Sequence, residues 1–326
     1  MTAAKKIQSA IEGSSWIRKM FEEGEKRKAK FGKDNVFDFS LGNPNLEPPP
    51  RFKQILKDLV NSTDRGMHGY MPNAGYVETR RAVADYLSRH NEPAFSPDDI
   101  VMTVGAGGGL NVVLKTILDP GDEVIIPSPY FFEYNFYVDN HQGVRKVVSS
   151  KKDFSLDFDA IKSAITKRTK ALLINSPNNP TGTVYTEGEL RNLGELLEME
   201  SKRIGRVIYL ISDEPYRKIV YNGVEVPSIF NIYKESFVVS SFSKDLSLPG
   251  ERIGYAAIHP GTADREILSA GMVLCNRIIG FVNAPALMQR AVSGLLDDSV
   301  DISVYKKKRD ILCKGCLLYT SDAADE

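Results

Sequence analysis

The stretch that decides the fold is residues 240–255, which read SSFSKDLSLPGERIGY. An apolar segment at residues 237–239 predicts a strand that ends just before Lys244, and residues 253–258 predict a second strand that begins directly after Arg252. The lysine and the arginine are therefore expected to meet at the ends of two strands. Taken alone, the stretch is as typical of a surface loop, because serine, proline and glycine are ordinary loop residues.

Short apolar segments alternate with helical patterns through most of the chain. Strands are predicted at residues 36–41, 100–103, 124–126, 145–148, 171–174 and 207–211, and helices at 51–60, 77–89, 110–118, 158–165, 187–203, 263–273, 284–296 and 300–312. Residues 1–35 predict a polar helical arm that ends near Gly32. This pattern predicts an α/β fold with a mostly parallel central sheet covered by helices on both faces. Ligands bind beyond the carboxyl ends of the strands in such sheets.

Composition excludes several classes of protein. The 326 residues carry 42 acidic and 42 basic side chains, which gives no electrostatic case for nucleic acid or an anionic membrane surface. Residues 1–19 contain no apolar stretch long enough for a signal peptide or a membrane span. Three cysteines fit a reducing compartment, and four scattered histidines show no ligand spacing. We therefore expect a cytoplasmic protein of about two domains without a metal site.

Four further loops follow predicted strands. Residues 105–109 (GAGGG) open a helix whose backbone N–H groups could hold a phosphate, although a glycine turn without a ligand fits too. Residues 176–182 (SPNNPTG) could aim an amide at a ligand or form a plain turn. Asp213 needs a positive partner if it is buried, or else caps a helix, and Tyr216 follows it closely. Residues 127–132 (PSPYFF) offer aromatic faces, which are more often core.

Together these loops resemble those of the class I/II pyridoxal-phosphate aminotransferases of fold type I. The resemblance covers roughly residues 10–315. It rests on the motifs Ser176 to Gly182, Asp213-x-x-Tyr216, and Ser241-x-Ser243-Lys244 with Pro249-Gly250-x-Arg252-x-Gly254. It implies the α/β/α layered fold of that family together with an incomplete small α/β domain.

The resemblance implies pyridoxal 5′-phosphate as the cofactor, with Lys244 bonded to its aldehyde. Asp213 would pair with the ring nitrogen, Asn179 and Tyr216 would bind the ring's phenolic oxygen, and Phe131 rather than Tyr130 would stack on the ring. The catalytic residues implied are Lys244, Asp213 and Tyr216.

The phosphate and the substrate have their own implied ligands. The phosphate would be held by Gly105, Ala106, Gly107, Ser241 and Arg252. Tyr70 is similar to a tyrosine that reaches the phosphate of the neighbouring subunit, which implies a homodimer. Gly42 and Asn179 are the implied substrate-binding positions.

The implied activity is ping-pong transfer of an amino group between an L-amino acid and a 2-oxo acid, with Lys244 as the general base. A pyridoxal-phosphate lyase that performs β-elimination or decarboxylation is an alternative on the same fold, and a non-catalytic aminotransferase-like sensor domain is another. Some relatives that act on acidic substrates carry lysine at the position of Gly107, so the resemblance does not identify aspartate as the substrate.

The resemblance also implies a domain division. We expect an arm and first segment of the small domain at residues 1–47, a large cofactor-binding domain at 48–286, and the start of the small domain at 287–315. Residues 316–326 look like translated adapter sequence rather than a native continuation. The expected arginine for the substrate α-carboxylate would then be missing.

Overall fold

The computed structural model describes residues 3–38 and 42–322, which divide into two compact units, Met1–Asn45 and Leu46–Glu326. The first unit contains α1 (Lys5–Phe31) and a short 3-10 helix, η1 (Lys33–Asn35). Helix α1 ends where Gly32 adopts a positive φ of 86°, so the predicted helical arm is confirmed. The predicted strand at 36–41 is wrong for residues 36–38, which lie in no strand, and residues 39–41 lie outside the described residues.

The second unit is built on a seven-stranded sheet in the order β1-β7-β6-β5-β4-β2-β3. The strands are β1 (Ile100–Thr103), β2 (Glu123–Ser128), β3 (Val144–Ser149), β4 (Thr169–Asn175), β5 (Tyr209–Asp213), β6 (Ser236–Ser241) and β7 (Gly254–Ile258). Only β7 runs antiparallel to its two neighbours, and the five strands from β6 to β3 are parallel, which confirms the predicted mostly parallel sheet. The carboxyl ends of the other strands therefore meet the start of β7 at one edge.

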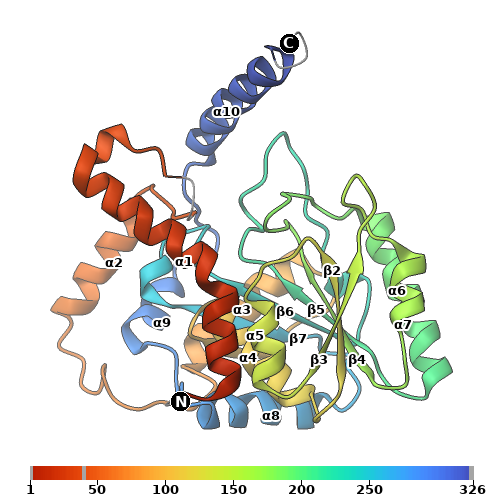
Figure 1. Cartoon of the computed structure of the whole chain (residues 1–326). Coiled ribbons are helices and arrows are strands. Elements are labelled where there is room, and N and C mark those ends of the chain that lie inside the picture. Colours follow the sequence, from red (N-terminus) through yellow and green to blue (C-terminus); the bar gives the residue numbers. More distant parts are fainter. Residues whose placement is uncertain (1–2, 39–41, 323–326) are drawn as a thin grey trace. The chain divides into compact units, whose positions relative to one another are not determined.

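Helices cover both faces of this sheet (Figure 1). One face packs against α4 (Gly105–Ile117), α5 (Tyr134–Asn140) and α8 (Arg265–Ile278). The other face packs against α2 (Pro50–Asn61), α3 (Val77–His90), α6 (Phe158–Ala164), α7 (Glu187–Ile204) and α9 (Ala286–Val292). Strand residues alternate between the two cores: Ala171 and Leu173 of β4 join the first core, and Leu172 and Ile174 join the second. Strands buried on both faces explain the continuous apolar runs in the sequence.

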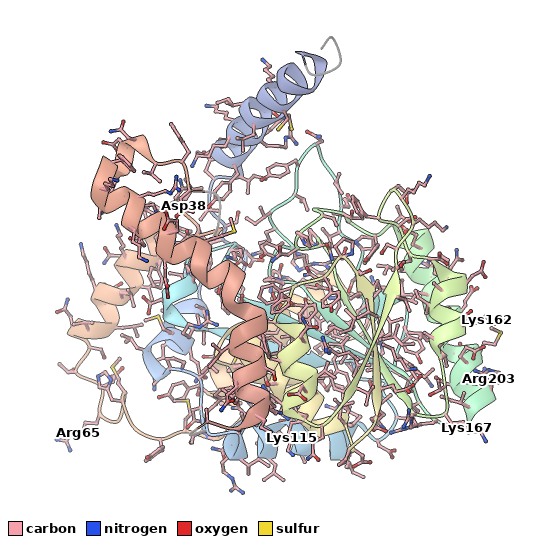
Figure 2. All side chains as sticks on the ribbon, in the orientation of Figure 1. Asp38, Arg65, Lys115, Lys162, Lys167 and Arg203 are labelled. Carbon is pink, nitrogen blue, oxygen red and sulfur yellow. The ribbon has the colours of Figure 1, made fainter. Side chains whose placement is uncertain are left out.

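The outer helix surfaces carry the charges. Figure 2 shows Lys162 on α6 and Arg203 on α7 pointing away from the sheet. Helix α7 starts with a capping box between Thr186 and Glu189 and ends at Gly205 in the left-handed conformation. The amphipathic helices thereby turn one face to the core and leave the loops at the sheet edge free to build a site.

Three elements differ from the sequence-based expectation. Helix α4 begins at Gly105 rather than residue 110, so the glycine run is itself helical. Helix α5 was not predicted. Helix α10 (Ile302–Asp322) continues past residue 312 and across the expected boundary at residue 315, and the domain division stays a prediction. Among the described residues, no helix is both long and apolar enough to cross a membrane.

Candidate active site

Strand register brings the polar loops of the sequence to one edge of the sheet. Asn175 at the end of β4 lies opposite Asp213 at the end of β5, and Ser241 at the end of β6 lies opposite Gly254 at the start of β7. Gly254 also pairs with Thr103, the last residue of β1. Each of these strand ends is followed by one of the predicted site segments: the 176–182 loop, Tyr216, Lys244 and the glycine run. These segments therefore all lie at the same edge of the sheet.

Asp213 is a buried carboxylate of which one oxygen accepts a hydrogen bond and the other has no partner among the described residues. Its Oδ2 accepts a 2.6 Å hydrogen bond from the Tyr134 hydroxyl. Its Oδ1 is buried and has no hydrogen-bond partner among the described residues. Burial raises the pKa of Asp213 to about 7, the Tyr134 hydrogen bond lowers it, and the charge of Glu214 raises it. Such a carboxylate is suited to a positively charged hydrogen-bond donor at Oδ1. Asp213 is the last residue of β5 and not the cap of a helix.

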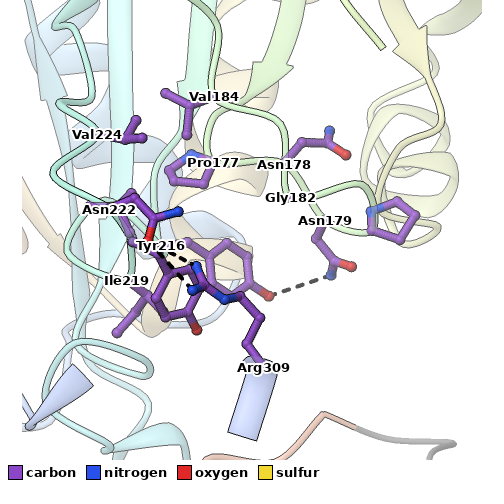
Figure 3. Close-up of a pocket in the computed structure, with 13 residues that line it drawn as sticks. Pro177, Asn178, Asn179, Gly182, Val184, Tyr216, Ile219, Asn222, Val224 and Arg309 are labelled. Carbon is purple, nitrogen blue, oxygen red and sulfur yellow. Dashed lines mark hydrogen bonds between the residues drawn. The ribbon is translucent and has the colours of Figure 1, made fainter. Parts of the chain in front are cut away.

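Asn179 and Tyr216 lie next to each other in the wall of a cavity. The Asn179 amide donates to the Tyr216 hydroxyl over 3.5 Å, as Figure 3 shows. The cavity has a volume of about 410 Å³ and is also lined by Arg309 of α10. Asn175 fixes the loop that carries Asn179, because its amide donates to the Asp213 carbonyl and its side-chain oxygen accepts from the Asn179 N–H. The two polar groups predicted for a ring oxygen thus share one wall.

Lys244 lies beside this wall. Its ammonium nitrogen is 5.9 Å from the centroid of the Tyr216 ring. Burial lowers the pKa of Lys244, and the positive charge of Arg252 lowers it further. A lysine amine with a lowered pKa is more often neutral at physiological pH and is then a nucleophile or a base.

The first turn of α4 meets Arg252 and the hairpin between β6 and β7 at close range. Gly105 has a φ of +73°, and a Cβ there would lie 2.7 Å from Arg252 Nη2. A Cβ on Gly254 would lie 2.4 Å from the Ser240 carbonyl oxygen and 3.0 Å from the Gly105 carbonyl carbon. Only glycine permits this approach at either position. Three groups suited to an anion thus lie together: the first-turn N–H groups of α4, which have no acceptor within the helix, the buried Ser241 and the Arg252 guanidinium.

The remaining predicted residues lie at varied distances from this centre. Phe131 is half-buried and packs edge-on against Tyr134, with ring centroids 5.6 Å apart. Ala106 and Gly107 lie in the first turn of α4. Tyr70 is 97% exposed in the loop before α3. Gly42 belongs to the first unit, so its predicted role stays a prediction.

Sequence reasoning missed three side chains at this centre: Tyr134, Asn175 and Tyr137. Tyr134 is fully buried, and burial and the neighbouring Asp213 raise its pKa well above the usual range. Helical spacing from Phe131 gives no signal for it, because Phe131 precedes α5 and is not helical.

Comparison with known proteins gives a consistent result. A sequence model described as "Aminotransferase class I and II" matches residues 34–314. A probable aspartate/prephenate aminotransferase of Aquifex aeolicus is 38% identical over 229 residues, which cover 68% of this chain and 56% of that protein. An aromatic-amino-acid aminotransferase of Thermococcus litoralis is 31% identical and covers 74% of this chain and 60% of its own length. The chain thus spans less than two thirds of these two relatives.

Solved structures agree with this. An amino transferase from Eubacterium rectale superposes with a TM-score of 0.92 at 41% identity, covering 97% of this chain and 80% of that one. A single mutant of Thermus thermophilus aspartate aminotransferase gives a TM-score of 0.76 at 31% identity and covers 85% of this chain and 71% of its own.

Proposed function

Because the chain belongs to the class I and II aminotransferase family and has its fold type I architecture, we propose that it is a pyridoxal-phosphate-dependent aminotransferase. Members of this family use pyridoxal 5′-phosphate as their cofactor. The proposed reaction moves an amino group between an L-amino acid and a 2-oxo acid in two half-reactions. The relatives named above are aminotransferases, which favours amino transfer over the lyase and sensor alternatives.

The observation that carries this proposal is the buried Oδ1 of Asp213, which has no hydrogen-bond partner in the described part of the chain. A buried carboxylate oxygen without a donor is costly, and a protonated ring nitrogen would supply both the hydrogen bond and the opposite charge. The charge would in turn hold Asp213 ionised, against the burial that now raises its pKa to about 7. The donor set therefore fits a pyridinium ring.

The phosphate end supports the same ligand. Gly105 and Gly254 leave room where a Cβ would collide with Arg252 or with backbone. Arg252 can contact a phosphate with two parallel N–H groups, and the start of α4 adds a favourable dipole. We assign Gly105, Ala106, Gly107, Ser241 and Arg252 to this end.

When bound, the cofactor supplies an aldehyde for the amine and a ring that takes up the electron pair released at the substrate α-carbon. Lys244 would provide the amine that holds the cofactor. The Lys244 Nζ would accept the proton of the substrate α-carbon as general base. The lowered pKa of Lys244 suits that task, since the amine must be neutral to accept a proton.

The other residues orient the reactants. The Asn179 amide and Tyr216 hydroxyl are placed to bind the ring oxygen, and Phe131 to stack on the ring. Asn179 and Gly42 are proposed substrate-binding positions. The exposed Tyr70 side chain suits a contact with a neighbouring subunit. We therefore propose a homodimer in which Tyr70 reaches the cofactor phosphate bound by the other subunit. Cys275 and Cys313 form no disulfide among the described residues, which fits action in the cytoplasm.

The test is a screen of amino donors with several 2-oxo acids, using the purified chain loaded with pyridoxal 5′-phosphate. Formation of the 2-oxo acid of the donor together with the new amino acid supports the proposal. Release of ammonia or carbon dioxide without a new amino acid identifies the lyase alternative. Absence of any cofactor-dependent absorbance in the loaded protein contradicts both.

A further inference from the structure

Tyr137 of α5 occupies the space that a side chain at position 107 would fill. A Cβ on Gly107 would lie 2.8 Å from the Tyr137 hydroxyl oxygen and 3.4 Å from its Cζ. Helices α4 and α5 lie next to each other on the same face of the sheet (Figure 1). The hydroxyl of a residue on α5 is thereby presented at the first turn of α4.

Two side chains thus approach the first turn of α4 from different elements. Arg252, from the β6–β7 hairpin, lies against Gly105, and the Tyr137 hydroxyl lies against Gly107. The first N–H groups of a helix have no acceptor within the helix. Gly107 itself brings only a backbone N–H to this place, so any side-chain donor on its side must come from another element.

The Tyr137 hydroxyl is available as a donor. Within the described parts of the chain the hydroxyl forms no hydrogen bond. The Tyr137 ring packs against the Tyr134 ring, with the two ring centroids 6.4 Å apart. Burial and the charges of Glu133 and Asp213 raise the pKa of Tyr137 to about 12, while the charge of Arg252 lowers it. The hydroxyl therefore keeps its proton at neutral pH. An anion bound beside the first turn of α4 would give this hydroxyl a charged acceptor.

We propose that the Tyr137 hydroxyl donates a hydrogen bond to the phosphate group of the cofactor, as a side-chain ligand in addition to Ser241 and Arg252. This inference rests on the proposed function, since it presumes that pyridoxal 5′-phosphate binds with its phosphate at the start of α4. In this assignment the Tyr137 hydroxyl contacts the phosphate of the cofactor and not its ring. Tyr137 thereby supplies, from α5, the side-chain donor that Gly107 cannot provide.

The decisive experiment compares two ligands that differ only in the phosphate. The wild-type chain, freed of cofactor, and its Tyr137→Phe variant are titrated with pyridoxal 5′-phosphate and with pyridoxal, and binding is read by absorbance. A hydrogen bond to a charged acceptor predicts a 10- to 100-fold weaker affinity of the variant for pyridoxal 5′-phosphate. Its affinity for pyridoxal should be unchanged.

A matched control is Tyr209→Phe. Tyr209 is a buried tyrosine and the first residue of β5, whereas Asp213 is the last residue of that strand. Burial likewise raises the pKa of Tyr209 to about 12. This variant should bind both ligands as the wild type does. Equal losses for both ligands in Tyr137→Phe, or no loss for either, would overturn the inference while leaving the proposed function intact. A wild-type chain that binds neither ligand would overturn the proposed function and the inference with it.

A second variant tests the contact itself. Gly107→Ala places a Cβ against the Tyr137 hydroxyl and should weaken binding of pyridoxal 5′-phosphate by displacing it. In the Tyr137→Phe background the hydroxyl is already absent, so the same Gly107→Ala change should cost clearly less. Simple multiplication of the two losses in the double variant would show that the residues act independently and would contradict the assignment.

Discussion

The Tyr134 hydroxyl donates to Asp213 Oδ2 over 2.6 Å, while Oδ1 of the same carboxylate is buried without a partner in the described structure. The two residues are 79 positions apart in the chain, one on α5 and one at the end of β5. This bond fixes the rotation of the carboxylate, so that one oxygen is held by the protein and the other is left for a ligand. Tyr134 is thus a positioning residue for Asp213.

Tyr134→Phe should destabilise the cofactor-free chain by about 1–3 kcal/mol at pH 8, because it leaves an ionised buried oxygen without its donor. The Tyr134 bond lowers the pKa of Asp213, so it favours the ionised carboxyl, and its loss should cost less at pH 5, where that carboxyl is protonated. Urea unfolding at the two pH values measures both. Tyr233→Phe, which removes a buried hydrogen bond to the neutral Ile208 carbonyl, should cost the same at both. A pH-independent loss in Tyr134→Phe would contradict this account.

Asp213 should also make the stability of the cofactor-free chain fall with rising pH. Its folded pKa is about 7, above the ordinary value of 3.8, so the folded chain binds the proton more tightly than the unfolded chain. The stability that this adds is complete below about pH 4 and is lost as the pH rises to 7, to a total on the order of 4 kcal/mol. Asp213→Asn should abolish that part of the pH dependence. The comparison is the free energy of unfolding of both proteins from pH 4 to 8, and parallel curves would rule out the assignment.

Much of the fold could be predicted because its elements carry local signals. The strands β1, β2, β4 and β6 are short apolar runs, and α7 has its capping box and terminal glycine in the sequence. Helix α5 could not be predicted in this way. Its sequence, YNFYVDN, consists largely of aromatic, β-branched and amide residues with modest helix propensity. Packing of Tyr134 and Val138 into the core stabilises it as a helix.

The glycine run shows a similar limit. Glycine disfavours helix interiors, so residues 105–109 predicted a loop before a helix at residue 110. In the structure α4 starts at Gly105, and a Cβ on Gly109 would lie 2.6 Å from Val239 Cγ1 of β6. Close packing of helix on strand explains the glycine there better than a flexible loop. The motifs allow the candidate site residues to be named from the sequence, whereas the contacts of Tyr134, Tyr137 and Asn175 are defined only by the folded chain.

Lys244→Ala should abolish both the visible absorbance of the loaded cofactor and amino transfer, because no other amine is assigned to the cofactor aldehyde. Absorbance spectra of the reconstituted variant and a donor assay check this. Lys115→Ala is a suitable control, since Lys115 is an exposed lysine on α4 (Figure 2). An unchanged spectrum in Lys244→Ala would remove Lys244 from the proposed role.

Gly105→Ala should weaken the phosphate end of the site more than it destabilises the fold. The new Cβ would lie 2.7 Å from Arg252 Nη2, which is the end of a flexible side chain and can move away, and the φ of +73° adds backbone strain of about 1 kcal/mol. Displacement of Arg252 should then reduce the affinity for pyridoxal 5′-phosphate by about tenfold or more, since a charge-assisted contact is lost. Gly188→Ala provides the contrast, because Gly188 lies in α7 with open space around its Cβ position, and alanine should be neutral or stabilising by up to about 1 kcal/mol. Thermal unfolding and cofactor titration of both variants separate the two effects. If Gly105→Ala keeps wild-type affinity, Arg252 does not depend on the space beside Gly105 for its contact with the phosphate.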